Sequence, residues 1–320
     1  MTGHPDREAM LAALLQALPY VRLYRGRCFV LKLGMEREEG AETLAGFAQQ
    51  ASIFHEFGIR LVIVHGGGPQ ATALAERLGV ESRFVEGRRV TSPQMIEPVV
   101  MALNGSVNTA IVSALCAAGL PAVGISGVGA GLLKARVRGP VTVQTPQGPA
   151  TVDYGEVGDL IAVDRSVLDR LMAAGFVPVV SPVAADETGR LLNVNADTVA
   201  AQIACALEAD KLVFLTKAPG LLEDRKDPAS LVSYTDLDGV AALEARGAVE
   251  GGMRPKMAAA RAALQGGVRR VHVVGLRQKA SLLLEVFTNA GAGTLIVKST
   301  SELAPGEQAQ PPEEAREASP

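Results

Sequence analysis

Short runs of apolar residues alternate along the chain with longer stretches in which apolar residues recur at helical spacing. The first pattern is typical of strands buried on both faces, and the second indicates amphipathic helices. We expect strands at 28–33, 61–64, 121–125, 176–180, 212–215, 268–274 and 294–297. We expect helices at 41–57, 69–79, 93–118 (one or two helices), 164–174, 196–208, 237–246, 254–265 and 279–287.

Strands separated by helices predict an α/β protein with a mostly parallel sheet covered on both faces, which is a three-layer αβα arrangement. The rhythm breaks at 131–162, where two extended segments flank Pro146-Gln-Gly, and again near 187–189. Both places favour a β-hairpin. Residues 300–320 are rich in Pro, Glu, Ala and Ser, so we expect a disordered tail there.

An additional amphipathic helix is expected at 6–18, ahead of the first strand. Its apolar residues follow a plausible Asp6 cap and are Met10, Leu11, Leu14, Leu15 and Leu18. The pattern allows two interpretations: a helix packed on its own domain, or a helix packed on another subunit.

Composition and charge exclude several classes of protein. Apolar residues make up 48% of the chain and charged residues 20%, which is ordinary for a soluble globular protein. We expect a cytoplasmic location. The net charge of −3 and pI of about 5.9 argue against a nucleic-acid binder. We expect no membrane span and no signal peptide. Cys28, Cys116 and Cys205 each lie in an apolar stretch, so we expect core residues and no metal site.

The segment from Leu61 to Gln70 is the most informative part of the chain. A buried strand ends at His65, three glycines follow, and a helix begins near Pro69. Glycines at such a turn expose backbone N–H groups beside a helix N-terminus, which favours an anion such as phosphate. The spacing is not that of a nucleotide P-loop. A tight turn that simply requires glycine is the alternative.

Other polar residues follow strands whose carboxyl ends should meet at one edge of the sheet. Phosphoryl transfer requires cations over the transferring group and something to hold those cations in place. Lys32 and Lys256 are the candidate cations, and Asp197 is the residue expected to orient both. Either Arg88 or Arg89 is a candidate for binding a carboxylate, with a surface-exposed turn as the alternative.

Taken in order, these segments resemble the amino-acid kinase family, over about residues 6 to 298. The motifs that carry the resemblance are Lys32-Leu-Gly, His65-Gly-Gly-Gly-Pro-Gln, Gly87-Arg-Arg-Val-Thr, Asn193-Val-Asn-Ala-Asp and Gly251-Gly-Met-Arg-Pro-Lys. Within the family, the combination is similar to members that transfer the ATP γ-phosphoryl group to the γ-carboxylate of N-acetyl-L-glutamate in arginine biosynthesis. The resemblance implies an open αβα sandwich of about eight strands. It also implies an amino-acid lobe (25–190) and a nucleotide lobe (191–299).

The resemblance also assigns roles. Lys32 and Lys256 would stabilise the transferring phosphoryl group, and Asp197 would position both lysines. The substrate-binding residues would be Gly67 and Gly68, through backbone N–H groups, and Arg89 and Asn193, at the α-carboxylate. The nucleotide-binding residues would be Gly34, Gly66, Thr216, Lys217, Gly220, Gly252 and Met253. Mg²⁺ would arrive with ATP, without a metal site of the protein's own.

The opening segment resembles the N-terminal helix of arginine-inhibited members of the family. In those members the helix joins dimers into a hexamer, so the resemblance implies an oligomerisation helix at 1–24, a homo-oligomer (dimer or hexamer), and arginine as a feedback inhibitor.

Three positions depart from the family pattern. Met35 replaces a glycine, Val128–Gly129 replaces a Lys-Asp pair, and Lys217 stands where an acid is usual. Lys32, Asp197 and Lys256 are all retained, so we favour an active kinase. Two alternatives stay open: a catalytically impaired protein that senses N-acetylglutamate or arginine, and a kinase for an aminoadipate derivative of lysine biosynthesis.

Overall fold

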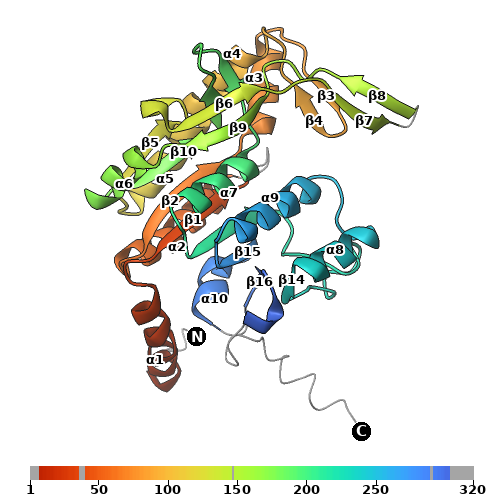
Figure 1. The fold of residues 1–320 in the computed structure, drawn as a ribbon. Helices are drawn as coiled ribbons and strands as arrows, with labels where there is room; N and C mark the ends of the chain where they lie inside the picture. Colours follow the sequence, from red (N-terminus) through yellow and green to blue (C-terminus); the bar gives the residue numbers. More distant parts are fainter. Residues whose placement is uncertain (1–6, 36–39, 146–147, 289–290, 303–320) are drawn as a thin grey trace.

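An eight-stranded sheet forms the middle layer of the protein (Figure 1). The computed structural model describes residues 7–35, 40–145, 148–288 and 291–302. All neighbouring strands pair parallel except β15 and β16, which pair antiparallel. In spatial order the strands are β14 (Tyr234–Asp236), β16 (Gly293–Val297), β15 (Arg270–Gly275), β13 (Lys211–Thr216), β1 (Cys28–Leu33), β2 (Arg60–His65), β10 (Val177–Ser181) and β5 (Ala122–Ser126). The predicted, mostly parallel sheet is confirmed.

Helices cover both faces of this sheet, because successive side chains of each strand point to opposite faces. Along β1, Phe29 and Leu31 pack into one core, and Cys28 and Val30 pack into the other. The first face is covered by α2 (Ala41–Glu56), α5 (Asn108–Ala117) and α10 (Ser281–Phe287). The second face is covered by α6 (Ser166–Ala173), α7 (Ala196–Ala206), α8 (Leu237–Ala245) and α9 (Met253–Gln265). The three-layer αβα fold is therefore confirmed.

A smaller sheet and two hairpins lie beyond one end of the main sheet (Figure 1). The four strands of the smaller sheet, in order, are β12 (Leu191–Asn193), β11 (Val183–Ala185), β6 (Leu133–Val137) and β9 (Gly158–Val163). The hairpins are β3 (Arg83–Val85) with β4 (Arg88–Val90), and β7 (Val141–Thr145) with β8 (Gly148–Val152). Both predicted hairpins are confirmed, as β7–β8 and β11–β12. In addition, β6 pairs antiparallel with β9, and β7 and β8 lie between these two strands in the sequence.

The remaining helical segments lie in several parts of the fold. They are α3 (Gly68–Arg77), α4 (Ile96–Val100), the π-helical stretch η1 (Met101–Val107), and the 3₁₀ turns η2 (Gly129–Gly131) and η3 (Thr300–Glu302). By length and composition alone, the continuous stretch Ile96–Ala117 passes the test for a helix that could cross a membrane. Core helices pass the same test, and here Ile111 and Leu115 are fully buried against the sheet.

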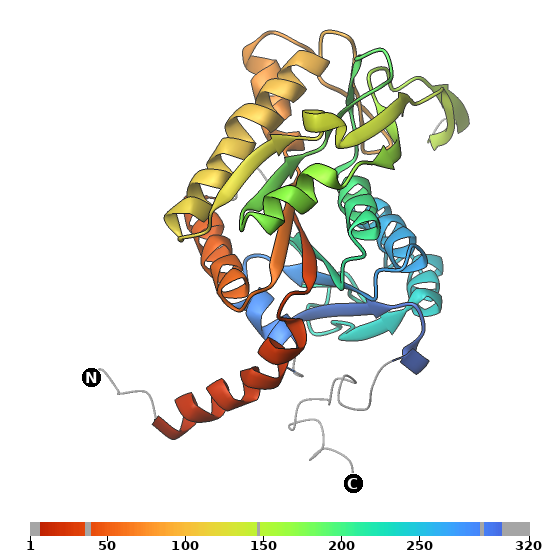
Figure 2. The same cartoon turned by 60° about the vertical axis from the view of Figure 1, so that its left-hand side comes forward.

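Helix α1 (Arg7–Tyr24) is longer than predicted and continues through Pro19. A proline inside a helix removes one backbone hydrogen bond, and its ring crowds the carbonyl four residues earlier. Here both Pro19 and Leu15 are exposed to solvent. The helix extends away from the rest of the protein (Figure 2). Leu11, Leu15 and Leu23 are each more than half exposed on it.

The expectation that all three cysteines are core residues is only partly met. Cys28 is buried, and burial raises its thiol pKa to about 11, but Cys116 is exposed and Cys205 is half-buried. Hairpin β3–β4 and strand β14 were not predicted. From residue 303 onward, the predicted tail lies outside the described residues.

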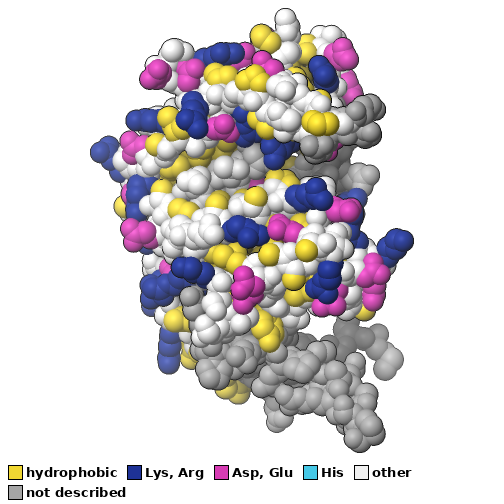
Figure 3. Space-filling model, turned by 45° about the vertical axis from the view of Figure 1, so that its right-hand side comes forward, with side chains coloured by type: hydrophobic (Ala, Val, Ile, Leu, Met, Phe, Trp, Pro, Cys, Tyr) yellow, Lys and Arg dark blue, Asp and Glu magenta, His cyan; other side chains and the backbone are white. Residues whose placement is uncertain are grey.

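On the face drawn in Figure 3, basic and acidic side chains are interspersed.

Candidate active site

Two buried lysines share one carboxylate oxygen at the carboxyl edge of the main sheet. Lys32 Nζ lies 2.9 Å from Asp197 Oδ1, and Lys256 Nζ lies 3.0 Å from the same atom. The three side chains are only 9–10% exposed. They carry a net charge of +1, since two ammonium groups face one carboxylate. Asp197 therefore contacts both lysines, and its role in orienting them stays a prediction.

Three separate elements position these groups. Lys32 is the fifth residue of β1 and points to the face covered by α7 and α9, where Asp197 and Lys256 occupy the first turns. The Asn195 side chain caps α7 by accepting the backbone N–H groups of Asp197 and Thr198. Burial raises the pKa of Asp197, but attraction from Lys32 and Lys256 outweighs it and leaves that pKa below its ordinary value. Asp197 is therefore ionised at neutral pH.

The glycine run forms a cradle beside this cluster. A Cβ built on Gly66 would lie 3.9 Å from Lys32 Nζ, and one on Gly67 would clash with Leu103 Cδ2 at 2.6 Å. The Gly66 N–H donates to the Leu33 carbonyl at 3.0 Å. Within the described residues, no hydrogen bond of the Gly67 or Gly68 N–H groups is found. Both donors stand at the N-terminus of α3, where an anion is favoured.

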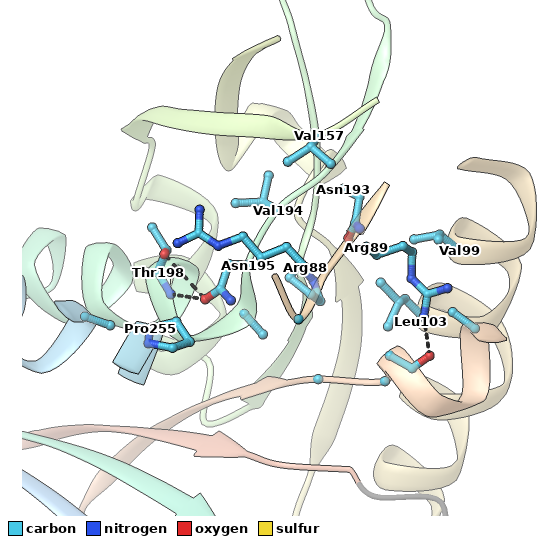
Figure 4. Close-up of a pocket in the computed structure, with 18 of the residues that line it drawn as sticks. Arg88, Arg89, Val99, Leu103, Val157, Asn193, Val194, Asn195, Thr198 and Pro255 are labelled. Atoms are coloured by element: carbon cyan, nitrogen blue, oxygen red, sulfur yellow. Dashed lines mark hydrogen bonds between the residues drawn. The ribbon is translucent and has the colours of Figure 1, made fainter. Parts of the chain in front are cut away.

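A cavity of about 450 Å³ opens above the cradle (Figure 4). Among the described residues that line it, Gly66, Gly67 and Gly68 come from the cradle, and Asn195 and Pro255 come from the starts of α7 and α9. Its described lining includes three arginines and no acidic residue. A cavity with this lining is suited to an anionic ligand.

The two neighbouring arginines of β4 have different surroundings. Arg89 is half-buried; it donates to the Gly68 carbonyl and to Thr72 Oγ1, both at 2.7 Å. Arg88 is exposed, and its guanidinium extends across the cavity toward Asn195 (Figure 4). Both arginines line the cavity. The alternative of a surface-exposed turn therefore describes only the part of Arg88 that faces solvent. The third arginine, Arg138, was missed by sequence reasoning, because nothing in its local pattern distinguishes it from a surface residue.

Asn193 lies at the end of β12, also on the cavity wall. Its Nδ2 donates to Thr91 Oγ1 at 3.2 Å, and its backbone N–H donates to the Glu156 carbonyl at 2.8 Å. The structure therefore brings Asn193 together with Arg89, Gly67 and Gly68 around one cavity.

The predicted nucleotide-binding residues, apart from Gly66, do not line this cavity but lie at the ends of β1 and β13 and at the start of α9. Lys217 is exposed after β13, and Thr216 Oγ1 donates to the Ala218 carbonyl at 2.7 Å. Gly220 is buried, and a Cβ there would lie 2.5 Å from Thr294 Oγ1, so packing alone requires this glycine. The others, Gly34, Gly252 and Met253, lie just after β1 or at the start of α9. Within the described residues, no cluster of three or more His, Cys, Asp or Glu forms a metal site.

The departures from the family pattern do not disturb the lysine cluster. Met35 is half-buried, its φ is not positive, and its side chain packs against the core under α2 and α10. The backbone at Met35 is therefore not in the left-handed region that would favour glycine. Val128 packs on the apolar cluster of α3 and α4, which accounts for an apolar residue at that position.

Comparisons with known proteins agree with this geometry. The amino acid kinase family model matches residues 27–275. The acetylglutamate kinase of Myxococcus xanthus is 45% identical over 91% of this chain and 95% of its own length. An N-acetylglutamate synthase structure from Neisseria gonorrhoeae, complexed with coenzyme A and N-acetyl-glutamate, has a TM-score of 0.76 and 28% identity, covering 91% of this chain and 64% of that one. The same synthase complexed with coenzyme A and L-arginine also has a TM-score of 0.76, with 27% identity, covering 90% of this chain and 65% of that one. By the extent of these matches, the chain belongs to the amino acid kinase family.

Proposed function

We propose that this protein is an acetylglutamate kinase, which transfers the γ-phosphoryl group of ATP to the γ-carboxylate of N-acetyl-L-glutamate. The observation that carries the proposal is the Asp197 oxygen that holds Lys32 and Lys256 at 2.9 and 3.0 Å beside two backbone N–H groups. The acetylglutamate kinase of Myxococcus xanthus supports the choice of substrate. The product is an acyl phosphate of arginine biosynthesis.

The chemistry requires no general base, because the nucleophile is a carboxylate that is already ionised at neutral pH. A γ-carboxylate oxygen forms a bond to the γ-phosphorus, and the bond from that phosphorus to the β,γ-bridging oxygen breaks, releasing ADP. Lys32 and Lys256 stabilise the negative charge on the transferring group, and Asp197 holds both ammonium groups in place. Gly67 and Gly68 donate their N–H groups to the same phosphoryl oxygens.

Each substrate has its own lobe in this proposal. Residues 25–190 bind N-acetylglutamate, with Arg89 and Asn193 at its α-carboxylate. Residues 191–299 bind ATP, near Thr216, Lys217 and Gly252, with Gly34, Gly66, Gly220 and Met253 shaping the site from their backbones. Mg²⁺ is carried by the ATP phosphates. We also infer a cytoplasmic location, where ATP is supplied.

The test is ATP- and Mg²⁺-dependent acyl-phosphate formation, trapped as the hydroxamate. N-acetylglutamate, N-acetylaminoadipate and glutamate are compared as acceptors, and we expect turnover selective for the first. Lys256→Ala should lower kcat by about 10² or more, since it removes a transition-state charge contact. The matched control Lys134→Ala changes an exposed lysine of β6 and should leave kcat unaltered.

Two other outcomes would replace the proposal. Preferential turnover of N-acetylaminoadipate would identify a kinase of lysine biosynthesis. Binding of N-acetylglutamate or arginine without any turnover would identify a sensor.

We further propose that the protein is a homo-oligomer, a dimer or a hexamer, inhibited by arginine. The exposed leucines Leu11, Leu15 and Leu23 on the projecting helix α1 support assembly through that helix. The arginine-bound synthase structure supports arginine as a ligand of this fold. Removing residues 1–22 should reduce both the assembly size in sedimentation and the inhibition by arginine. If neither changes, α1 has no such role.

A further inference from the structure

His65 is a buried histidine at the end of β2, and the catalytic scheme above assigns it no role. It has no exposed surface, and both ring nitrogens have partners. Its Nδ1 lies 2.8 Å from the Gly66 carbonyl oxygen, and its Nε2 lies 3.0 Å from Asn108 Nδ2. His65 therefore connects Asn108, the first residue of α5, to the glycine cradle.

The contacts fix the protons on both side chains. Asn108 Nδ2 also lies 2.9 Å from the Val179 carbonyl oxygen, which can only accept, so that atom of Asn108 is the NH₂ group. An NH₂ group only donates, and His65 Nε2 must accept from it. The ring proton is therefore on Nδ1, which donates to the Gly66 carbonyl. Burial is the main reason that the pKa of His65 falls to about 4, with Lys32 on β1 lowering it further, so the ring is neutral at pH 7.

Holding the Gly66 carbonyl has a consequence for the next N–H group. In a planar trans peptide, the carbonyl of Gly66 and the N–H of Gly67 point in opposite directions. When the carbonyl is held toward His65, the Gly67 N–H is directed away from the ring. That N–H has no hydrogen bond within the described residues.

The other side of Gly67 rests on the same helical segment. A Cβ on Gly67 would lie 2.6 Å from Leu103 and 3.2 Å from Val107, both in η1, which ends immediately before Asn108. A π-helical turn is an uncommon element that recurs at functional sites. Here η1 and α5 form one continuous helical stretch. This stretch packs against Gly67 through η1 and holds His65 through Asn108.

We propose that Asn108 and His65 are positioning residues for phosphoryl transfer: they hold the Gly66 carbonyl so that the Gly67 N–H faces the transferring phosphoryl group. This inference rests on the proposed kinase function. Neither side chain touches the substrates, so both act through the orientation of one peptide group.

The first test uses the wild-type protein and does not depend on activity. Nitrogen-15 NMR of the histidine rings at pH 7 should show His65 as the neutral tautomer with the proton on Nδ1. A ring protonated on Nε2, or a charged ring, would overturn the assignment even if the protein proves to be an active kinase.

The second test compares two substitutions of His65. In His65→Asn the side-chain NH₂ can take the place of Nδ1 and donate to the Gly66 carbonyl, whereas in His65→Gln it takes the place of Nε2. We expect kcat to fall by about tenfold or more in H65Q, with KM for both substrates nearly unchanged, and to fall much less in H65N. Thermal unfolding of both variants separates this from lost stability. Equal losses of kcat in H65N and H65Q would overturn the proposal.

Asn108→Leu provides a variant outside the histidine. It removes the donor to Nε2, so we expect the His65 ring to lose its single tautomer in the NMR spectrum and kcat to fall with little change in KM. An unchanged tautomer with unchanged kcat would show that Asn108 does not position His65.

Discussion

Replacing Asp197 with asparagine tests the central feature of the site. The amide keeps the shape of the side chain and loses its charge. Both lysine nitrogens contact one oxygen, so they lie less than about 6 Å apart. Two positive charges at that distance repel by about 3 kcal/mol at an effective dielectric constant of about 20. In the wild-type protein the carboxylate offsets this repulsion, but in Asp197→Asn nothing does.

A misplacement costing about 3 kcal/mol in the transition state corresponds to a loss of about a hundredfold in kcat. Removing one partner of a buried ion pair also lowers the free energy of unfolding, by about 3–5 kcal/mol. Hydroxamate trapping measures the first effect, and urea unfolding at pH 7 measures the second. The control is Asp169→Asn, which breaks the partly exposed Arg165–Asp169 pair and should cost less than about 1 kcal/mol with no loss of kcat. An Asp197→Asn enzyme that kept a third of its activity would refute the assigned role.

Three further predictions concern pH, Met35 and Arg88. Burial lowers the pKa of His65 and of His272 to about 4, against about 6.5 when unfolded, so the unfolded chain binds more protons as the pH falls. Urea unfolding at pH 7.5, 6 and 5 measures the effect. The free energy of unfolding should fall by about 1.4 kcal/mol per pH unit for each histidine between about pH 6 and 4. A free energy of unfolding that does not change with pH would contradict this prediction. Met35→Gly should lower the free energy of unfolding by about 1–2 kcal/mol in thermal or urea unfolding, because Met35 packs on the core. It should change kcat less than about threefold. A large gain in kcat would show that the thioether crowds the site. Arg88→Ala should raise KM for N-acetylglutamate by about tenfold with kcat nearly constant, since the lost guanidinium extends into the cavity. A rise confined to KM for ATP would contradict a role of Arg88 in binding N-acetylglutamate.

The sequence predicts the central sheet well because its strands are buried on both faces. A run such as 61–64 has no polar position, so its pattern is unambiguous once the flanking glycines limit its length. The sequence also predicts that two lysines and one aspartate come together, whereas their catalytic role stays a prediction. Lys32, Asp197 and Lys256 each stand at a strand end or a helix start, and those ends meet at one edge of a parallel sheet.

Elements whose formation depends on partners distant in the sequence could not be predicted from the local pattern. Strand β14 has three residues, and its pairing with β16 is specified by a segment about 60 residues away. Hairpin β3–β4 is similarly short, and Phe84 on it is half exposed, so no buried run marks it. Met35 shows a different limit: a family pattern predicts glycine there, but whether a larger residue fits depends on packing that only the fold reveals.

The central place of β1 in the sheet has a consequence for synthesis of the chain. This strand ends at Leu33, yet one of its two edges pairs with β13, which begins only at Lys211. At translation rates of about 5–20 residues per second, that edge waits for roughly ten to forty seconds before its neighbour emerges. An unpaired apolar edge is a template for association between chains. Nascent chains of this protein are therefore at greatest risk of aggregation before β13 is complete, and fragments ending before Lys256 lack one lysine of the candidate active site.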